Sequence, residues 1–567
     1  YVRGDSLAEF WAMAFYPLIL LAADGVVAGE KGRKGEREKG GSRPATVVYW
    51  PVALFALAYA GLILSHNISA LIFSPFVLLY LVIRLFFAER RATWDDDSPG
   101  DRRPSFRAVW PAAAGLLLAF ALAAWFFLPA LAEKGLAQLG PVTEGYFHFS
   151  NHFRGRDLVQ GGLLFNYDPD GGVAFRLGLI QMALALAGAV AWRLAERAKG
   201  GPAAQAEATR KRLAAPVVRR STFVIFSALV AVFMITPLAR PLWDHLPLLS
   251  FAQFPWRFLS IASFFLALLA GGVVLVADQP VARAAIALTG SLVLLAAGLL
   301  GLRTDYLILT DADVTAERLS QYEWFTGNIG TTVSAEYLTP ESAPRPWAGA
   351  WLNAGTRDRA VAVAGQMTAE LVERDVTRQT WQIVAGEDGT EVLFPTMYWP
   401  GWRATVDGEE VELRPYPSSG LMALTVPAGE HVITLRLGRT PVRLAAEVLS
   451  LAAFAVTIGL MVFGRARMIG REQASRRLPI GLLRGLLVIA AGLLLAAFLW
   501  RGDPDELPAG DLTWDFAQMG YLHHAPGGIG FTDGARLHSY GYSADEIAAG
   551  QTVTVTLSLT PGKSASA

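Results

Sequence analysis

The sequence predicts a membrane α-helical bundle of about ten transmembrane helices, with β-sandwich-like domains outside the cytoplasm. Three observations lead to this fold class. Long apolar stretches recur along the chain, and about 18 apolar residues are enough to cross the hydrocarbon layer as a helix. The loops between these stretches are alternately rich and poor in Lys and Arg, which is typical of a chain that crosses a membrane repeatedly. One long segment changes instead to a period of two, the pattern of β-strands.

Composition indicates the same class of protein. Hydrophobic residues make up 53% of the chain and charged residues only 17%, which is unlike a soluble globular protein of this size. The formal net charge of zero does not identify a partner, because the charge is segregated by membrane side. We expect membrane lipids and no nucleic acid as partners. The sequence contains no cysteine, which excludes disulfides, thiol nucleophiles and thiolate metal sites.

The apolar stretches give the predicted spans in chain order. They are residues 7–27, 45–64, 68–87, 108–132, 175–195, 221–237, 258–277, 282–302, 444–464 and 480–500.

The loops then predict the orientation. Lys and Arg favour the cytoplasmic side, so we expect the four basic loops there: 30–43, 89–107, 193–220 and 465–477. The loops with few basic residues are expected on the outer side: 65–67, 133–172 and 238–257. The connection 278–281 is too short to indicate a side. The first residue, the segment 303–440 and the C-terminal tail are then also outside the cytoplasm.

Four regions follow from these spans. They are a helical membrane domain (1–302, with the outer loop 133–172), a β-domain (303–440), two further spans (441–500) and a β-rich tail (501–567). Within the β-domain, Asp407-Gly408 supplies the positive φ angles of a two-residue hairpin turn, and residues 427–430 form a second turn between alternating strands. Because the chain begins with Tyr1 and ends just after a strand-like segment, we expect it to be a fragment of a longer protein.

Several segments resemble the YfhO-like family of bacterial multi-pass membrane proteins. They are YWPGWRATVDG at 398–408, VPAGEHV at 426–432, SHNISAL at 65–71, SFAQFPWRF at 250–258 and GTTVSAEYL at 330–338. Such chains are sometimes labelled as related to 6-pyruvoyl-tetrahydropterin synthase. Nothing in this sequence supplies the soluble zinc site of three histidines that pterin chemistry of that kind requires.

The wider resemblance is to the GT-C superfamily of polytopic glycosyltransferases. It implies a multi-pass protein of the bacterial inner membrane that takes a sugar from a polyprenyl-phosphate carrier at the outer face, during envelope glycan assembly. The catalytic acid of those enzymes lies in the first outer loop, which would here precede Tyr1. A non-catalytic scaffold or a lipid-glycan transporter with the same fold is the alternative.

A lipid phosphate at the outer interface needs cationic or hydrogen-bonding partners near helix ends. Arg257 lies where the seventh predicted span begins, and His66 lies at the outer tip between the second and third spans. Glu9 lies at the outer end of the first span and is a candidate to line the same site. Each has a structural alternative: Arg257 can snorkel to the interface, His66 can belong to a turn, and Glu9 can interact with the helix dipole.

The outer loop 133–172 supplies the remaining candidates. Tyr146, His152 and Arg154 combine an aromatic ring with polar groups, which suits the recognition of a sugar. His148 and His152 are four residues apart, the spacing of a metal pair on one helical face, but no third ligand completes the pattern. We therefore predict no metal ligand and no certain cofactor, and a divalent metal stays an open alternative.

Overall fold

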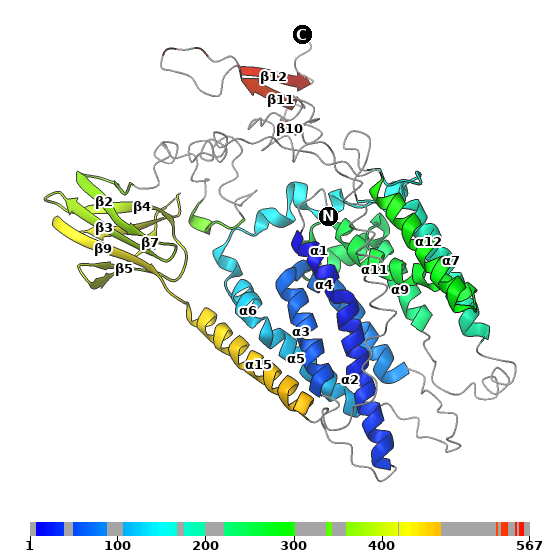
Figure 1. Ribbon diagram of the computed structural model, residues 1–567. Helices are drawn as coiled ribbons and strands as arrows, with labels where there is room; N and C mark the ends of the chain where they lie inside the picture. Colours follow the sequence, from blue (N-terminus) through cyan, green and yellow to red (C-terminus); the bar gives the residue numbers. More distant parts are fainter. Residues whose placement is uncertain are drawn as a thin grey trace. The chain divides into compact units, whose positions relative to one another are not determined.

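A computed structural model describes most of the membrane region and the β-domain. The described residues are 7–38, 49–87, 106–166, 175–198, 220–300, 336–342, 359–417, 419–466, 529–530, 535–542, 550, 552 and 555–560. They fall into two compact units (Figure 1). The first comprises residues 1–127, 149–304 and 445–505, and the second comprises residues 128–148, 305–444 and 506–567.

Apolar helices build the first unit. They are α1 (Leu7–Met13), α2 (Phe15–Glu38), α3 (Tyr49–Ser65), α4 (Asn67–Val82), α5 (Phe106–Leu122), α6 (Ala124–Ala132, which continues into the second unit), α7 (Leu179–Ala198), α9 (Arg220–Phe233), α10 (Arg240–His245), α11 (Phe258–Gly271), α12 (Pro280–Leu299) and most of α15 (Pro441–Ala466). A π-helical turn, η2 (Ile83–Phe87), follows α4, and the 3₁₀ turn η11 (Gly272–Val276) follows α11.

Six of these segments are long and apolar enough to cross a membrane: Leu7–Val27, Asn67–Leu85, Leu179–Arg197, Pro255–Val276, Pro280–Leu299 and Pro441–Val462. Two more predicted spans are bent helix pairs, α5 with α6 at 73° and α9 with Pro237–His245 at 92°. The second predicted span is the shorter apolar helix α3, and the tenth, residues 480–500, lies outside the described residues. The described part of the chain thus has six helices long and apolar enough to cross a membrane, or up to eight if each bent pair is one span, as in a membrane protein. Ten spans stay a prediction.

The bend between α5 and α6 has a visible physical cause. At the break, the hydroxyl of Ser450 on α15 donates to the carbonyl of Ala121 at 2.9 Å and accepts from the backbone N–H of Trp125 at 2.9 Å. An unsatisfied backbone group in an apolar layer is costly, so a broken helix there needs such a partner.

Two glycines allow α7 to pack directly on α11 and η11. A Cβ on Gly188 would lie 1.9 Å from the carbonyl oxygen of Leu269, and a Cβ on Gly272 would lie 2.5 Å from the carbonyl oxygen of Gly188. Small residues at such crossings let helix backbones come close in a membrane.

Replacing Gly188 by Ala should therefore lower the melting temperature of the protein in detergent, at a cost of about 1–3 kcal/mol for overpacking. Gly290, in the middle of α12, is the matched control because a Cβ there meets nothing within 4 Å. Gly290→Ala should leave the melting temperature unchanged or raise it, since Ala is the better helix former by about 1 kcal/mol. Equal effects of the two substitutions would contradict the close approach of the helices.

The second unit contains an antiparallel β-sandwich. Its strands are β1 (Val361–Ala362), β2 (Met367–Arg374), β3 (Arg378–Ala385), β4 (Thr390–Met397), β5 (Trp402–Val406), β6 (Glu409–Val411), β7 (Arg414–Pro415), β8 (Leu421–Val426) and β9 (Gly429–Leu437). One sheet has the order β1-β4-β8-β7 and the other the order β2-β3-β9-β5-β6. Side chains from both sheets share one core: Trp381, Ile383, Phe394, Met422, Leu424, Ile433 and Leu435.

The first of the two predicted turns is confirmed, and the second is shorter than predicted because β9 already begins at Gly429. Asp407 and Gly408 have φ angles of 51° and 92° and join β5 to β6 as a two-residue hairpin. The turn after β8 leads to β9 in the other sheet, so it crosses the sandwich and does not close a hairpin. In the described parts of the tail, a third sheet holds β10 (Ile529–Gly530), β11 (Arg536–Tyr542) and β12 (Val555–Thr560).

The hairpin turn also carries an ion pair with a pH dependence. Asp407 Oδ2 lies 2.6 Å from His431 Nδ1, and Asp407 Oδ1 accepts from the backbone N–H of Val432 at 2.8 Å. The hydrogen bond from His431 lowers the pKa of Asp407, and the hydrogen bond to Asp407 raises the pKa of His431.

The stabilisation from this pair should be greatest where both side chains are charged even in the unfolded chain. Their ordinary pKa values place this window from above about 4 to below about 6.5. The stabilisation should be lost as the pH rises through the raised pKa of His431, and also as the pH falls through the lowered pKa of Asp407. Hydrogen exchange of β5 and β9, measured from pH values below this window to pH values above it, checks the expectation. In a His431→Gln variant the loss of protection on the alkaline side should disappear, and an unchanged profile would contradict the role of the pair.

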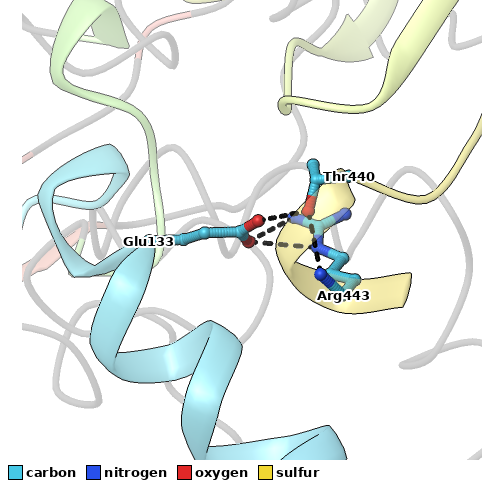
Figure 2. A network of polar contacts seen from close by, with 3 residues as sticks. All are labelled: Glu133, Thr440 and Arg443. Atoms are coloured by element: carbon cyan, nitrogen blue, oxygen red, sulfur yellow. Dashed lines mark hydrogen bonds and ion pairs between the residues drawn. The ribbon is translucent and has the colours of Figure 1, made fainter. Parts of the chain in front are cut away.

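A partly buried ion pair fixes the point where the sandwich leads into α15. Glu133, just after α6, accepts from Thr440 Oγ1 at 2.6 Å and from the Nη2 and Nε of Arg443 at 2.7 Å and 3.0 Å (Figure 2). Both charged side chains are less than a quarter exposed. The end of α6 and the start of α15 therefore lie together, as expected if the two helix ends share one side of the membrane.

Candidate functional site

The segment before α11 has an unusual backbone. A 3₁₀ turn over Leu249–Ala252 is flanked by Leu248 at φ 66° and Gln253 at φ 57°. Non-glycine residues at positive φ cost of the order of 1–3 kcal/mol and cluster at functional sites. This strained turn leads directly into Arg257, the last residue of a second 3₁₀ turn, Pro255–Arg257.

Arg257 is held in a defined position by its own segment. Its Nη1 donates to the carbonyl of Ala252 at 3.0 Å and to Gln253 Oε1 at 3.4 Å. Its guanidinium lies 5.1 Å from the centroid of the Phe254 ring and 5.9 Å from that of Trp256, both within the range of a cation–π interaction. These contacts fix the cation at the beginning of an apolar span and do not fit an arginine that extends freely into solvent.

Two other predicted site residues lie near this cation, although they come from distant parts of the sequence. Arg257 interacts electrostatically with Glu9 on α1 and with His66, the residue before α4. Glu9 is only 2% exposed, and its Oε1 has no hydrogen-bond partner among the described residues. The structure therefore brings three of the predicted residues, Arg257, His66 and Glu9, into one cluster.

The protonation state of His66 follows from its surroundings. Burial lowers the pKa of His66 to about 4, and the positive charge of Arg257 contributes to the shift. The ring is therefore neutral at physiological pH. Its Nδ1 accepts from the backbone N–H of Ser69 at 3.2 Å and caps α4, so its single hydrogen must be on Nε2. His66 is thus both a helix cap and a neutral hydrogen-bond donor.

Buried hydroxyl groups connect the helices beneath this cluster. Tyr16 on α2 and Ser260 on α11 form a hydrogen bond of 3.2 Å, and Ser260 donates to the carbonyl of Arg257 at 2.9 Å. Ser69 on α4 bonds to His66 through its hydroxyl at 2.8 Å. None of these three hydroxyl residues is among the candidates that the sequence predicts. The available signal was the spacing, because Ser69 and Ser260 each follow a candidate residue by three positions, a typical helix-start distance.

Aromatic rings border Arg257. Phe254 stacks on Trp256 at 5.1 Å between centroids, and Trp256 stacks on Phe175 at 3.8 Å. The predicted candidate His152 packs edge-on against Phe254 at 4.7 Å. His152 therefore reaches the ring that also contacts Arg257, as a part of the same neighbourhood.

The remaining loop candidates are Arg154 and Tyr146. Arg154 is held through its backbone, which donates to the carbonyl of Ile235 at 2.9 Å. Tyr146 belongs to the 3₁₀ turn Gly145–Phe147 in the second unit, and its side chain lies outside the described residues.

The structure does not place His148 and His152 on one helix, as their spacing would require for a metal-binding pair. His148 has an extended backbone with ψ 127° and ends one 3₁₀ turn, while His152 follows another, Phe149–Asn151. The spacing of four residues therefore does not place the two rings on one helical face. Among the described residues no group of three or more His, Cys, Asp or Glu side chains could hold a metal ion.

The cluster can bind an anion at Arg257, next to the hydrogen-bond donor Nε2–H of His66. The carboxylate of Glu9 can accept a hydrogen bond from a hydroxyl group. The chain has no matching family model, no matching curated protein and no matching solved structure.

Proposed function

We propose that this protein binds a polyprenyl-phosphate-linked sugar at the outer interface of the bacterial inner membrane and acts as a GT-C-like glycosyltransferase in envelope glycan assembly. The observation that supports it best is the fixed cation Arg257 at the start of an apolar span, with His66 beside it. The class of donor comes from the resemblance to GT-C proteins. The β-domains are placed outside the cytoplasm in this proposal.

The chemistry of the cluster suits such a donor. The lipid phosphate carries negative charge and hydrogen-bond acceptors, which match the guanidinium of Arg257 and the Nε2–H of His66. Because His66 is neutral, it adds a donor without a second charge that would have to be desolvated. Glu9 can accept from a sugar hydroxyl, and the rings at Phe254 and Trp256 suit contact with the sugar or the prenyl chain.

Binding to the full-length protein in lipid nanodiscs tests this proposal. The probes are a polyprenyl-phosphate sugar, the same polyprenyl phosphate without sugar, and the free polyprenol. We expect the first two to bind and the polyprenol to bind much more weakly, because it lacks the phosphate. Equal binding of all three would contradict phosphate recognition, and sugar release from the first probe to an acceptor would distinguish an enzyme from a scaffold or transporter.

The proposed orientation gives a separate expectation. Reporter fusions after Arg37, Arg103, Arg210 and Arg471 should report the cytoplasm, because the surrounding loops are basic. Fusions after Gly155 and Gly408 should report the outside. Each span depends on the orientation of its neighbours, so one reversed reporter would break the proposed topology.

A further inference from the structure

A row of three arginines crosses the exposed face of the five-stranded sheet. Arg378 on β3 pairs in register with Arg436 on β9, which pairs in turn with Arg403 on β5. All three side chains are exposed, while their neighbours Leu435 and Ala404 point into the core. Adjacent strands are about 4.8 Å apart, so the row is only about 10 Å long.

This row costs stability in the isolated sheet. Like charges directly opposite each other on neighbouring strands are destabilising. Within the described residues the row has one ion pair, Arg403 with Glu410 at 3.8 Å, and both side chains are about two thirds exposed or more. Such an exposed pair contributes little. The acidic neighbours Glu373 and Glu410 lie on the edge strands, opposite Thr380 and Thr405 of the next row, so the central Arg436 faces arginine on both sides.

The row lies at the end of the sheet that leads into the membrane. Arg436 precedes Pro441, the first residue of a candidate span, by five residues, a length of chain that reaches at most about 18 Å. The connection is fixed at two points, because Gly438 N–H donates to the carbonyl of Gly401 at 2.7 Å and Thr440 bonds to Glu133 at 2.6 Å. The arginine row therefore stays close to the point where α15 would enter the bilayer.

The opposite end of the same face has the opposite character. Glu430, the second residue of β9, lies on this face and accepts from Gln382 Nε2 at 2.5 Å, and Asp407 lies in the turn after β5. The face is thus basic next to α15 and acidic far from it. This polarity favours one orientation of the sheet towards a negatively charged surface.

We propose that Arg378, Arg436 and Arg403 form a docking surface for the anionic phospholipid headgroups of the leaflet from which α15 emerges. Guanidinium groups match phosphate oxygens through paired hydrogen bonds, and basic residues near an anionic leaflet are attracted to its surface. Docking holds the β-sandwich in one orientation on the membrane. The inference is independent of the proposed glycosyltransferase activity.

The chain contains no cysteine, so a single label site can be introduced into it for a direct test. A Thr377→Cys substitution introduces a single label site in the exposed turn next to Arg378, and an environment-sensitive fluorophore is attached there. The protein is placed in nanodiscs that contain a lipid with a nitroxide-labelled headgroup as quencher. Quenching is compared between discs of phosphatidylcholine alone and discs that also contain phosphatidylglycerol.

We expect stronger quenching in the anionic discs, and less of this difference at high salt because exposed charges are screened. In the double variant Arg378→Gln/Arg436→Gln, the ratio of docked to undocked protein should fall about fivefold for each arginine removed. The matched control Arg359→Gln/Arg414→Gln removes two exposed arginines associated with the other sheet and should retain the lipid dependence. Equal quenching in neutral and anionic discs, or an equal loss in the control variant, would overturn the proposal.

Stability separates docking from a purely structural role. Removing like charges from the row should leave the melting temperature of Arg378→Gln/Arg436→Gln unchanged or slightly higher in detergent. A clear fall in melting temperature would mean that the arginines support the fold and would overturn the proposal.

Discussion

An Arg257→Ala variant is expected to lose almost all binding of a polyprenyl-phosphate sugar. Removing one partner of a desolvated, hydrogen-bonded charge pair costs about 2–5 kcal/mol, which is at least about a 30-fold loss of affinity. Arg257 is fixed by Ala252 and Gln253 before any ligand arrives, so the wild-type protein does not have to order this side chain on binding. The measurement is equilibrium binding to the full-length protein in nanodiscs.

Two further variants make this result specific. Arg257→Lys keeps the charge but loses the fork geometry, so it should restore binding only in part. Arg240→Ala removes an exposed arginine from α10, where it pairs with Asp244 at 3.7 Å, and should leave binding unchanged. Equal affinity in wild type and Arg257→Ala would remove Arg257 from the site. Failure of the folded wild type to bind would reject the proposed donor.

Only some residues of the site can be predicted from sequence patterns. Arg257 and His66 were identifiable because each stands at the start of an apolar segment, and hydropathy is a local property. The polar neighbour Tyr16 was not identifiable, since it lies within an apolar run and acquires a role only through its hydrogen bond to Ser260 on a distant helix. The loop around His152 shows the same limit, because Tyr146 is six residues away and belongs to the other compact unit.

The same distinction between local and long-range features applies to the fold. The hairpin at Asp407-Gly408 was predictable because its positive φ angles select those residue types locally. The partner of each strand was not, since the short turn after β8 connects two different sheets. The bend before α6 was equally hidden, because the group that satisfies it, Ser450, comes from a helix more than 300 residues later.

The largest stability effect is expected at the ion pair between Glu133 and Arg443. Glu133 is only 13% exposed, and its two oxygens accept from Thr440 and Arg443. An Arg443→Met variant leaves this largely buried carboxylate without its cation. Breaking a fully buried pair in this way costs about 3–5 kcal/mol, so we expect a loss of up to about 3 kcal/mol for this partly buried pair. The melting temperature of this variant in detergent should fall clearly. The melting temperature of Glu133→Gln should fall less, because the amide oxygen can still accept a hydrogen bond from Thr440.

The double variant Glu133→Gln/Arg443→Met distinguishes a lost attraction from a stranded charge. With both charges removed there is no ion left to desolvate, so much of the stability lost in Arg443→Met should return. Asp244→Ala, which breaks the exposed pair with Arg240, is the matched control and should cost at most about 1 kcal/mol. A double variant no more stable than Arg443→Met would contradict this account, since the cost would then come from lost packing of the arginine stem and not from the buried charge of Glu133.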